Sequence, residues 1–323
     1  MNKRIAILGS GRMGEGIALS FILSGQDVVM FDFKSRGEEE RDTYYLEIKN
    51  RLLAELRYLE SRSNIREGMS NEIVSRLQIV DANIVNGRYN DIKLAFEAVP
   101  EVKEIKRKCL AWASEHFYSD VVIASTTSTF LVTELSEMVS YPERFMNAHW
   151  LNPAYLMPLV EVSKGENTQQ HFIDFLFKFL QEIGKVPVLC NASPGYIVPR
   201  LQVLIMNEAA RMVEEGVASA EDIDTATRIG FGLRYSVLGV LEFIDWGGGD
   251  TLYYASDYLS EMLGERFKAP DVVQENMRLQ KRGFRDGRGF FEYKGIDLEE
   301  HRKRRSDAFI ERLRISRLMP ATL

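Results

Sequence analysis

The segment ILGSGRMGEGIA, residues 7–18, constrains the fold more than any other part of this chain. Its glycines Gly9, Gly11 and Gly14 follow the short apolar run KRIAIL and stand where a helical pattern begins. A short β-branched run that stops at a glycine predicts a buried parallel strand. In a strand–turn–helix unit of this kind, Gly9 makes the tight turn, Gly11 lets the backbone approach a pyrophosphate, and Gly14 lets helix and strand pack closely.

An acidic residue follows the glycine turn at the distance typical of dinucleotide-binding proteins. Asp32 ends the second predicted strand, DVVMFD, roughly 20 residues after Gly9. A carboxylate here accepts hydrogen bonds from the ribose hydroxyls of the adenosine and repels a 2′-phosphate, so the segment predicts NAD as cofactor rather than NADP. Lys34 and Arg36 follow directly, and cations at this place could instead hold a phosphate. A glycine turn without a ligand is the remaining alternative.

The first 192 residues continue this alternation of apolar strands and helical patterns. After KRIAIL and DVVMFD, strands are expected at LQIV, LAFEAV, VVIAS, FMNAHW, MPLVEVS and VPVLC. Alternation of this kind predicts βαβ units and a parallel sheet. We therefore expect an α/β Rossmann-type dinucleotide-binding domain at residues 1–192, with a helical arm at about 38–77. After the turn-rich segment NASPGY the patterns are helical throughout, so an all-α domain is expected at residues 193–323.

Composition excludes several classes of partner. The formal net charge of −6 argues against nucleic acid, because binding phosphates needs a basic face. The two cysteines, Cys109 and Cys190, have no close pairing, which fits a reducing cytoplasm and gives no zinc motif, and no metal is expected. No apolar run is long enough to span a membrane. The basic segment from Leu298 predicts a solvated amphipathic helix, with an anion-binding tail as the alternative.

The segment HWLNPAYLMPLVE carries the candidate chemistry. His149 ends a predicted strand, where open α/β sheets bind their ligands, and Glu161 lies twelve positions later. Oxidation of an alcohol by hydride transfer needs a base for the hydroxyl proton, and histidine suits this role because its unperturbed pKa lies near neutrality. A carboxylate beside it can fix the tautomer of the ring and stabilise the imidazolium. A structural histidine at the corner of the sheet is the alternative.

Several motifs together resemble the L-3-hydroxyacyl-CoA dehydrogenase family over nearly the whole chain. They are GSGRMGEGIA, EAVPE, ASTTST, HWLNPAYLMPLVEV, SPGYIVPR, EEGVASAEDID and GRGFFEY. The resemblance, which is to 3-hydroxybutyryl-CoA dehydrogenases in particular, implies an NAD-dependent enzyme of fatty acid metabolism that oxidises a CH–OH group. It also implies a dinucleotide-binding domain followed by an all-helical domain that forms a homodimer.

The resemblance also assigns roles to single residues. His149 resembles the catalytic base and Glu161 its carboxylate partner. Ser128 resembles the hydroxyl that touches cofactor and substrate, and Asn152 the amide beside the nicotinamide and the reacting oxygen. The positions that match the cofactor site are Gly9, Gly11, Arg12, Met13, Gly14, Asp32, Glu101 and Lys106.

Three departures from the family pattern bear on the substrate. Pro199 replaces an asparagine that the family commonly has near the substrate, and Thr126 replaces another amide. The segment GFGLRYSVLGVLEFIDWGGGD is longer than its acyl-CoA counterpart and resembles the lambda-crystallin/L-gulonate and L-carnitine dehydrogenase branch, whose substrates carry a free carboxylate. Arg234 in this segment would then hold that carboxylate. Its structural alternative is an ion pair with an acid such as Glu242 or Asp245.

Three hypotheses follow from these motifs. The first, which the breadth of the resemblance favours, is a dehydrogenase of a short-chain 3-hydroxyacyl-CoA. The second is a dehydrogenase of a free 3-hydroxy acid, similar to carnitine or gulonate. The third is a non-catalytic NAD-binding protein, which an intact pair of His149 and Glu161 argues against.

Overall fold

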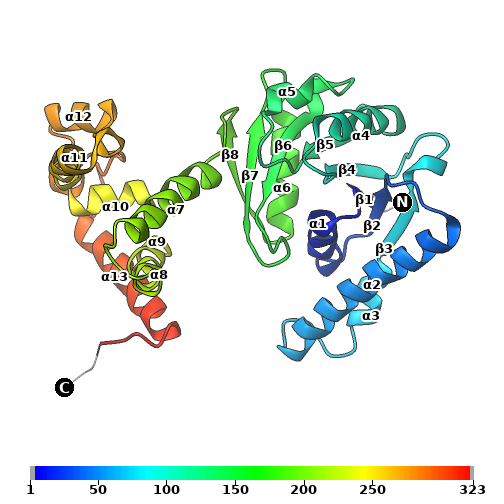
Figure 1. Ribbon diagram of the computed structural model, residues 1–323, viewed down its shortest axis with the longest axis horizontal. Helices are drawn as coiled ribbons and strands as arrows, with labels where there is room; N and C mark the ends of the chain where they lie inside the picture. The colour runs from blue at the N-terminus through cyan, green and yellow to red at the C-terminus, as the bar shows by residue number, and fades with distance from the viewer. Residues whose placement is uncertain (1–3, 321–323) are drawn as a thin grey trace. The chain divides into compact units, whose positions relative to one another are not determined.

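The computed structural model describes residues 4–320, which fall into two compact units divided between Ile205 and Met206 (Figure 1). The first unit is an eight-stranded sheet covered by helices. Its elements are β1 (Arg4–Leu8), α1 (Arg12–Leu23), β2 (Val28–Asp32), α2 (Glu38–Ser61), α3 (Ser70–Ser75), β3 (Leu77–Asp81), η1 (Ala82–Ile84), β4 (Ile92–Glu97), α4 (Lys103–His116), β5 (Val122–Ser125), α5 (Val132–Ser136), η2 (Pro142–Arg144), β6 (Phe145–Trp150), β7 (Leu159–Lys164), α6 (Gln170–Glu182) and β8 (Val186–Asn191).

The order of the strands produces the crevice in which α/β proteins bind ligands. The strands lie in the order β3-β2-β1-β4-β5-β6-β7-β8, so the chain leaves β1 toward β2 on one side and later returns to β4 on the other. The carboxyl ends of β1 and β4 therefore flank the point where the direction of winding reverses. The glycine turn leaves β1 at this point, which confirms the predicted Rossmann-type architecture.

One pair of strands departs from the predicted parallel sheet. All neighbouring strands are parallel except β6 and β7, which pair antiparallel. Only residues 151–158 connect these two strands. A parallel crossover needs a dozen or more residues, so this connection permits only an antiparallel return. The antiparallel register places His149 directly opposite Glu161.

The two faces of the sheet bury different side chains, as alternation along each strand requires. On one face Ile5 and Ile7 of β1 contact a core built with α1, α2 and α6. On the other face Ala6 and Leu8 contact a core built with α4 and α5. The central strands β1 and β2 are thus apolar on both sides, which is why they read as continuous hydrophobic runs.

The second unit is helical in all its regular elements among the described residues, as predicted. Helix α7 (Val198–Glu214) contains the division between the units. It is followed by α8 (Ala220–Ala226), η3 (Thr227–Gly232), α9 (Leu233–Tyr235), α10 (Val240–Gly247), α11 (Gly249–Leu263), η4 (Glu265–Phe267), α12 (Asp271–Arg278), η5 (Phe284–Asp286) and α13 (Leu298–Ile315). Helix α8 continues into η3, one turn of π-helix that contains two glycines.

Buried hydrogen bonds hold residues 290–293, which precede α13, against α10. The Asp245 carboxylate of α10 is 2% exposed and accepts hydrogen bonds from the backbone of Phe290 and Phe291 and from the hydroxyl of Tyr293. The basic segment from Leu298 forms α13, a helix with half-buried positions on one side, as predicted. Across residues 4–320, no helix combines the length and the apolar character that crossing a membrane requires.

Candidate active site

His149 and Glu161 form a buried hydrogen-bonded pair. Because their positions are opposite in the β6–β7 register, the two side chains lie on the same face of the sheet. Nδ1 of His149 lies 2.9 Å from Oε2 of Glu161, and the two residues are 5% and 0% exposed. The two side chains that the sequence singled out are thus brought into direct contact.

The second oxygen of Glu161 holds the start of the segment that leads into α7. Oε1 accepts hydrogen bonds from the backbone N–H groups of Ile197 at 2.9 Å and Val198 at 2.8 Å. Burial raises the pKa of Glu161, but the hydrogen bonds from His149 and from these two backbone groups outweigh it and leave the pKa lowered. Glu161 is therefore a carboxylate near neutral pH.

The charge of Glu161 determines the tautomer of His149. A carboxylate has no proton to donate, so Nδ1 of the imidazole carries the hydrogen and Nε2 carries the free lone pair. Nε2 lies 3.1 Å from Oγ of Ser128, whose hydroxyl can donate to it. A histidine held in this way presents a basic nitrogen, next to a hydroxyl, which is the arrangement a general base requires.

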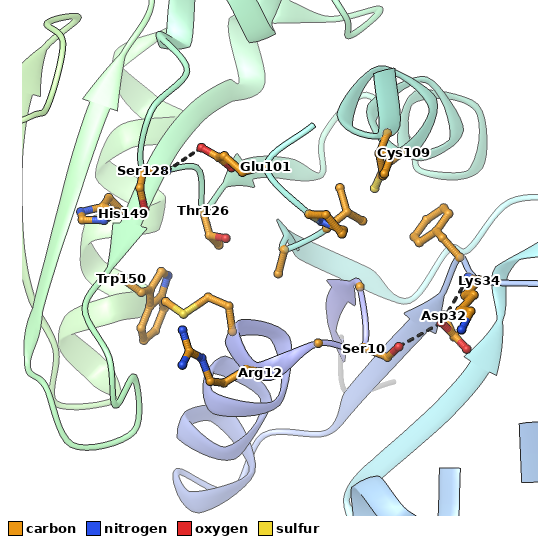
Figure 2. A pocket seen from close by; sticks show the side chains of 18 of the residues that line it. Ser10, Arg12, Asp32, Lys34, Glu101, Cys109, Thr126, Ser128, His149 and Trp150 are labelled. Atoms are coloured by element: carbon orange, nitrogen blue, oxygen red, sulfur yellow. Dashed lines mark hydrogen bonds between the residues drawn. The ribbon is translucent and has the colours of Figure 1, made fainter. Parts of the chain in front are cut away.

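Ser128 lies on a loop after β5 that Glu101 holds in place. Oε1 of Glu101 accepts hydrogen bonds from the backbone of Ser128 and Thr129, both at 3.0 Å, and from the hydroxyls of Thr127 and Thr129. Figure 2 shows the bond between Ser128 and Glu101. Burial raises the pKa of Glu101, but the bonds from Thr127, Thr129 and Lys106 lower it to about 2.

Lys106 acts behind Glu101 and does not line the cavity. It is 1% exposed, and its Nζ lies 3.1 Å from Oε2 of Glu101 and 3.0 and 3.1 Å from the oxygens of Glu97. The sequence placed Lys106 along the cofactor site, and the structure shows that it reaches the site only through Glu101. Glu97, fully buried at the end of β4, was not singled out from the sequence, although an acid that ends an apolar strand could have indicated it.

Tyr196 was also missed by the sequence analysis. Its ring stacks on the imidazole of His149, with the centroids 5.0 Å apart and the planes 10° from parallel. Its hydroxyl donates to the carbonyl oxygen of Thr127 at 2.8 Å and accepts from the side chain of Asn147 at 3.0 Å. Tyr196 thus links the segment before α7 to the Ser128 loop and to the ring of His149.

A single cavity of about 1310 Å³ joins the glycine turn to His149. Figure 2 shows Asp32 and Lys34 at one end of it and Ser128 and His149 at the other. Of the site residues predicted from the sequence, those that line the cavity are Gly9, Gly11, Arg12, Met13, Asp32, Glu101, Ser128, His149 and Asn152, together with Pro199. The cavity therefore brings most of the predicted cofactor residues and the predicted base into one space, whereas Gly14 and Lys106 do not line it.

The glycine turn fits a dinucleotide. Gly9 has a φ of +121°, which favours glycine, and a Cβ on Gly14 would lie 2.1 Å from the carbonyl oxygen of Gly9. A Cβ on Gly11 would meet nothing within 4 Å, so the backbone here is open to the cavity. No side chain caps the first turn of α1, which leaves its N–H groups available to a phosphate.

Asn152 is exposed in the connection between β6 and β7. Lys185 supports this connection, because its buried Nζ donates to the carbonyl oxygens of Ala154 at 2.6 Å and Met157 at 3.0 Å. The loop that carries Asn152 is thus held on the body of the domain beside His149.

Arg234, in the second unit, does not make the ion pair that the sequence offered as its alternative. It is exposed, and among residues 4–320 it has no hydrogen bond or ion pair, only the ring of Phe243, with 5.4 Å between the guanidinium carbon and the ring centroid. Glu242 is bound by Arg305 and His301, and Asp245 accepts hydrogen bonds from the backbone of Phe290 and Phe291. Both acids that could have paired with Arg234 are therefore engaged elsewhere.

Comparison with known families finds two models that together cover most of the chain. The family "3-hydroxyacyl-CoA dehydrogenase, NAD binding domain" matches residues 4–193, and "3-hydroxyacyl-CoA dehydrogenase, C-terminal domain" matches residues 195–293. The match to an NAD-binding domain agrees with the open turn at Gly11, and the cofactor is NAD.

Individual relatives span nearly the full chain. The mitochondrial hydroxyacyl-coenzyme A dehydrogenase of Sus scrofa is 31% identical over 294 residues, 90% of this chain and 91% of that protein. The 5-formyl-3-hydroxy-2-methylpyridine 4-carboxylate 5-dehydrogenase of Mesorhizobium japonicum is 29% identical over 309 residues, 94% of this chain and 96% of that protein. The solved 3-hydroxyacyl-CoA dehydrogenase of Archaeoglobus fulgidus is 29% identical, with a TM-score of 0.75 over 98% of this chain and all of that chain.

Proposed function

Because the chain belongs to the 3-hydroxyacyl-CoA dehydrogenase family and is an NAD-dependent dehydrogenase of CH–OH groups, we propose that it oxidises a short-chain 3-hydroxyacyl-CoA. 3-Hydroxybutyryl-CoA is the representative substrate, and the product is the 3-ketoacyl-CoA. The observation that carries this proposal is the hydrogen bond between the buried Glu161 and His149, whose side chain lines the cavity that holds the glycine turn.

In the proposed reaction His149 is the general base. Its unprotonated Nε2 accepts the proton of the substrate 3-hydroxyl, while the bound NAD supplies the acceptor for the hydride. Glu161 stabilises the imidazolium that forms, because its carboxylate lies 2.9 Å from Nδ1. Ser128, whose Oγ lies 3.1 Å from Nε2, and Asn152, which lines the same cavity, hold the reacting oxygen.

The proposed cofactor residues follow from the same cavity. The pyrophosphate is held by the glycine turn and the first helical turn of α1, which consist of Gly9, Gly11, Arg12, Met13 and Gly14. Asp32 lies at the adenosine end, and Glu101, fixed by Lys106, orders the Ser128 loop beside the nicotinamide end.

A free 3-hydroxy acid is the second candidate substrate. The relative from Mesorhizobium japonicum has nearly the same length as this chain, and its name describes a substrate that is a carboxylate without coenzyme A. Arg234 has no acid partner among residues 4–320, and a guanidinium can hold a carboxylate with two parallel charge-assisted bonds. Pro199 on the cavity wall, in place of a side chain that can hydrogen-bond, also favours a different substrate.

A substrate panel with NAD tests the proposal. NADH formation is measured with 3-hydroxybutyryl-CoA, longer 3-hydroxyacyl-CoAs, free 3-hydroxybutyrate, carnitine and gulonate. We expect the highest kcat/KM for 3-hydroxybutyryl-CoA. A higher kcat/KM for a free acid would replace this proposal by the second candidate, and Arg234→Met should then raise the KM for that acid at least about tenfold. No turnover of any 3-hydroxy compound would support a non-catalytic NAD-binding protein.

We further propose the division of labour between the two domains. Residues 1–192 bind NAD, and residues 193–323 bind substrate and form a homodimer. Support for the dimer comes from α11, where Tyr254, Tyr258 and Met262 are each more than 60% exposed at helical spacing and form an apolar stripe. Light scattering on the purified chain tests this, since Tyr258→Arg should convert a dimer to a monomer. A cytoplasmic location is proposed because both cysteines are free thiols.

A further inference from the structure

Asp32 has most of its hydrogen-bonding capacity occupied by the protein itself. Oδ1 accepts from the hydroxyl of Ser10 at 2.9 Å and from the backbone N–H of Lys34 at 3.2 Å. Oδ2 accepts from Nε of Arg36 at 3.0 Å. A carboxylate offers about four acceptor positions, so about one is left for a ribose hydroxyl. Asp32 is also paired with a guanidinium, which offsets the negative charge that would repel a phosphate.

Arg36 is fixed in position and still has free donors. Its guanidinium carbon lies 3.9 Å from the centroid of the Tyr44 ring, and its Nη1 donates to Glu40 at 3.2 Å. Nη2 donates no hydrogen bond to any residue between 4 and 320, and Arg36 lines the cavity. A planar guanidinium held in this way has two N–H groups left for a ligand.

Lys34 provides a second cation at the same place. Its side chain is exposed and lines the cavity beside Asp32, as Figure 2 shows. Its Nζ has no hydrogen bond or ion pair in the described part of the chain. Lys34 and Arg36, two cations with free donors, therefore flank the end of β2. Asp32, the acid that would exclude a phosphate there, is paired with Arg36.

We propose that Lys34 and Arg36 form a binding site for the 2′-phosphate of NADP(H), so that the protein binds NADP(H) as well as NAD(H). An arginine beside the end of the second strand is the usual way in which this fold accommodates a 2′-phosphate. Arg36 supplies charge-assisted hydrogen bonds from Nη2, and Lys34 supplies a mobile ammonium. Glu40 also accepts a hydrogen bond from Arg36, but only from Nη1, so Nη2 stays available to a phosphate.

Fluorescence titration with NADH and NADPH tests this site without any substrate. The wild-type protein should bind NADPH with a Kd within about tenfold of that for NADH. Arg36→Met keeps an unbranched side chain against Tyr44 but removes the charge. It should raise the Kd for NADPH at least about tenfold, the effect of losing a charge-assisted bond, and change the Kd for NADH less than about threefold. Arg36→Lys should retain part of the NADPH affinity.

Arg51→Met is the matched control. Arg51 makes a two-point ion pair with Glu15 and does not line the cavity, so this variant removes the same charge and should change neither Kd. A wild-type Kd for NADPH more than about a hundredfold above that for NADH would overturn the proposal. Equal weakening of both nucleotides by Arg36→Met would also overturn it, because Arg36 would then serve only to shape the pocket. Neither outcome depends on which alcohol the enzyme oxidises.

Discussion

Glu161→Gln is the perturbation that most fully tests how the charge of one side chain prepares the base. The oxygen of the introduced amide should stay with the backbone N–H groups of Ile197 and Val198, because an amide NH₂ cannot face two donors. The NH₂ group must then face Nδ1 of His149, so Nδ1 becomes an acceptor and the proton moves to Nε2. A protonated Nε2 cannot accept the proton of the substrate.

The expected loss is the whole contribution of general-base catalysis. That contribution is about 10²–10⁴-fold in kcat, equivalent to about 3–5 kcal/mol of transition-state stabilisation. NADH binding should remain within about threefold of wild type, because Glu161 does not line the cavity. The assay is kcat for 3-hydroxybutyryl-CoA at saturating NAD, beside a fluorescence titration with NADH. Glu166→Gln, at an exposed site shortly after the same strand, is the charge-matched control. A fall in kcat of less than about tenfold would refute the tautomer argument.

Three further predictions concern the cofactor turn and the groups around the base. Gly14→Ala places a Cβ 2.1 Å from a backbone oxygen and should lower the free energy of unfolding, measured in urea, by about 1–3 kcal/mol. Gly11→Ala, whose Cβ meets no atom within 4 Å, should change the free energy of unfolding by less than about 0.5 kcal/mol but weaken NADH binding. Equal stabilities of the two variants would contradict the packing account. Because the pKa of Glu101 is lowered, its carboxylate stabilises the fold above its ordinary pKa of 4.5, and this contribution is lost as the pH falls toward about 2. In urea titrations, the difference in free energy of unfolding between wild type and Glu101→Gln should therefore shrink over that range. A constant difference would contradict this stabilising role of the carboxylate. Tyr196→Phe keeps the ring on His149 and should lower kcat less than about tenfold. Tyr196→Leu removes the stacked ring and should lower kcat further. The reverse order in steady-state assays would show that the hydroxyl matters more than the ring.

The local features of the fold could be predicted because the signals that specify them are local. The glycine turn predicts a helix directly after it, and α1 begins at Arg12. Strand–turn–helix units and glycine turns depend on neighbours in sequence, so pattern and composition suffice for them. The antiparallel return of β7 could also have been expected, because residues 151–158 are too few for a crossover.

The contacts that complete the site could not be predicted, because they join distant parts of the chain. Tyr196 reaches His149 only after the segment before α7 docks on Glu161. Glu97 and Lys106 become one buried ion pair only when α4 packs on the sheet. The freedom of Arg234 depends on Glu242 being bound by Arg305, 63 residues later in the chain. None of these contacts has a spacing that a linear pattern could reveal.

His149→Gln tests the central claim, that the histidine opposite Glu161 is the base of an NAD-dependent dehydrogenase. The measurement is kcat for 3-hydroxybutyryl-CoA, combined with the Kd for NADH of the same preparation. We predict a fall in kcat of about 10²–10⁴-fold with a Kd for NADH within about threefold of wild type, because the ring lies at the opposite end of the cavity from Asp32. A variant that binds NADH normally and turns over at a near-wild-type rate would contradict the account.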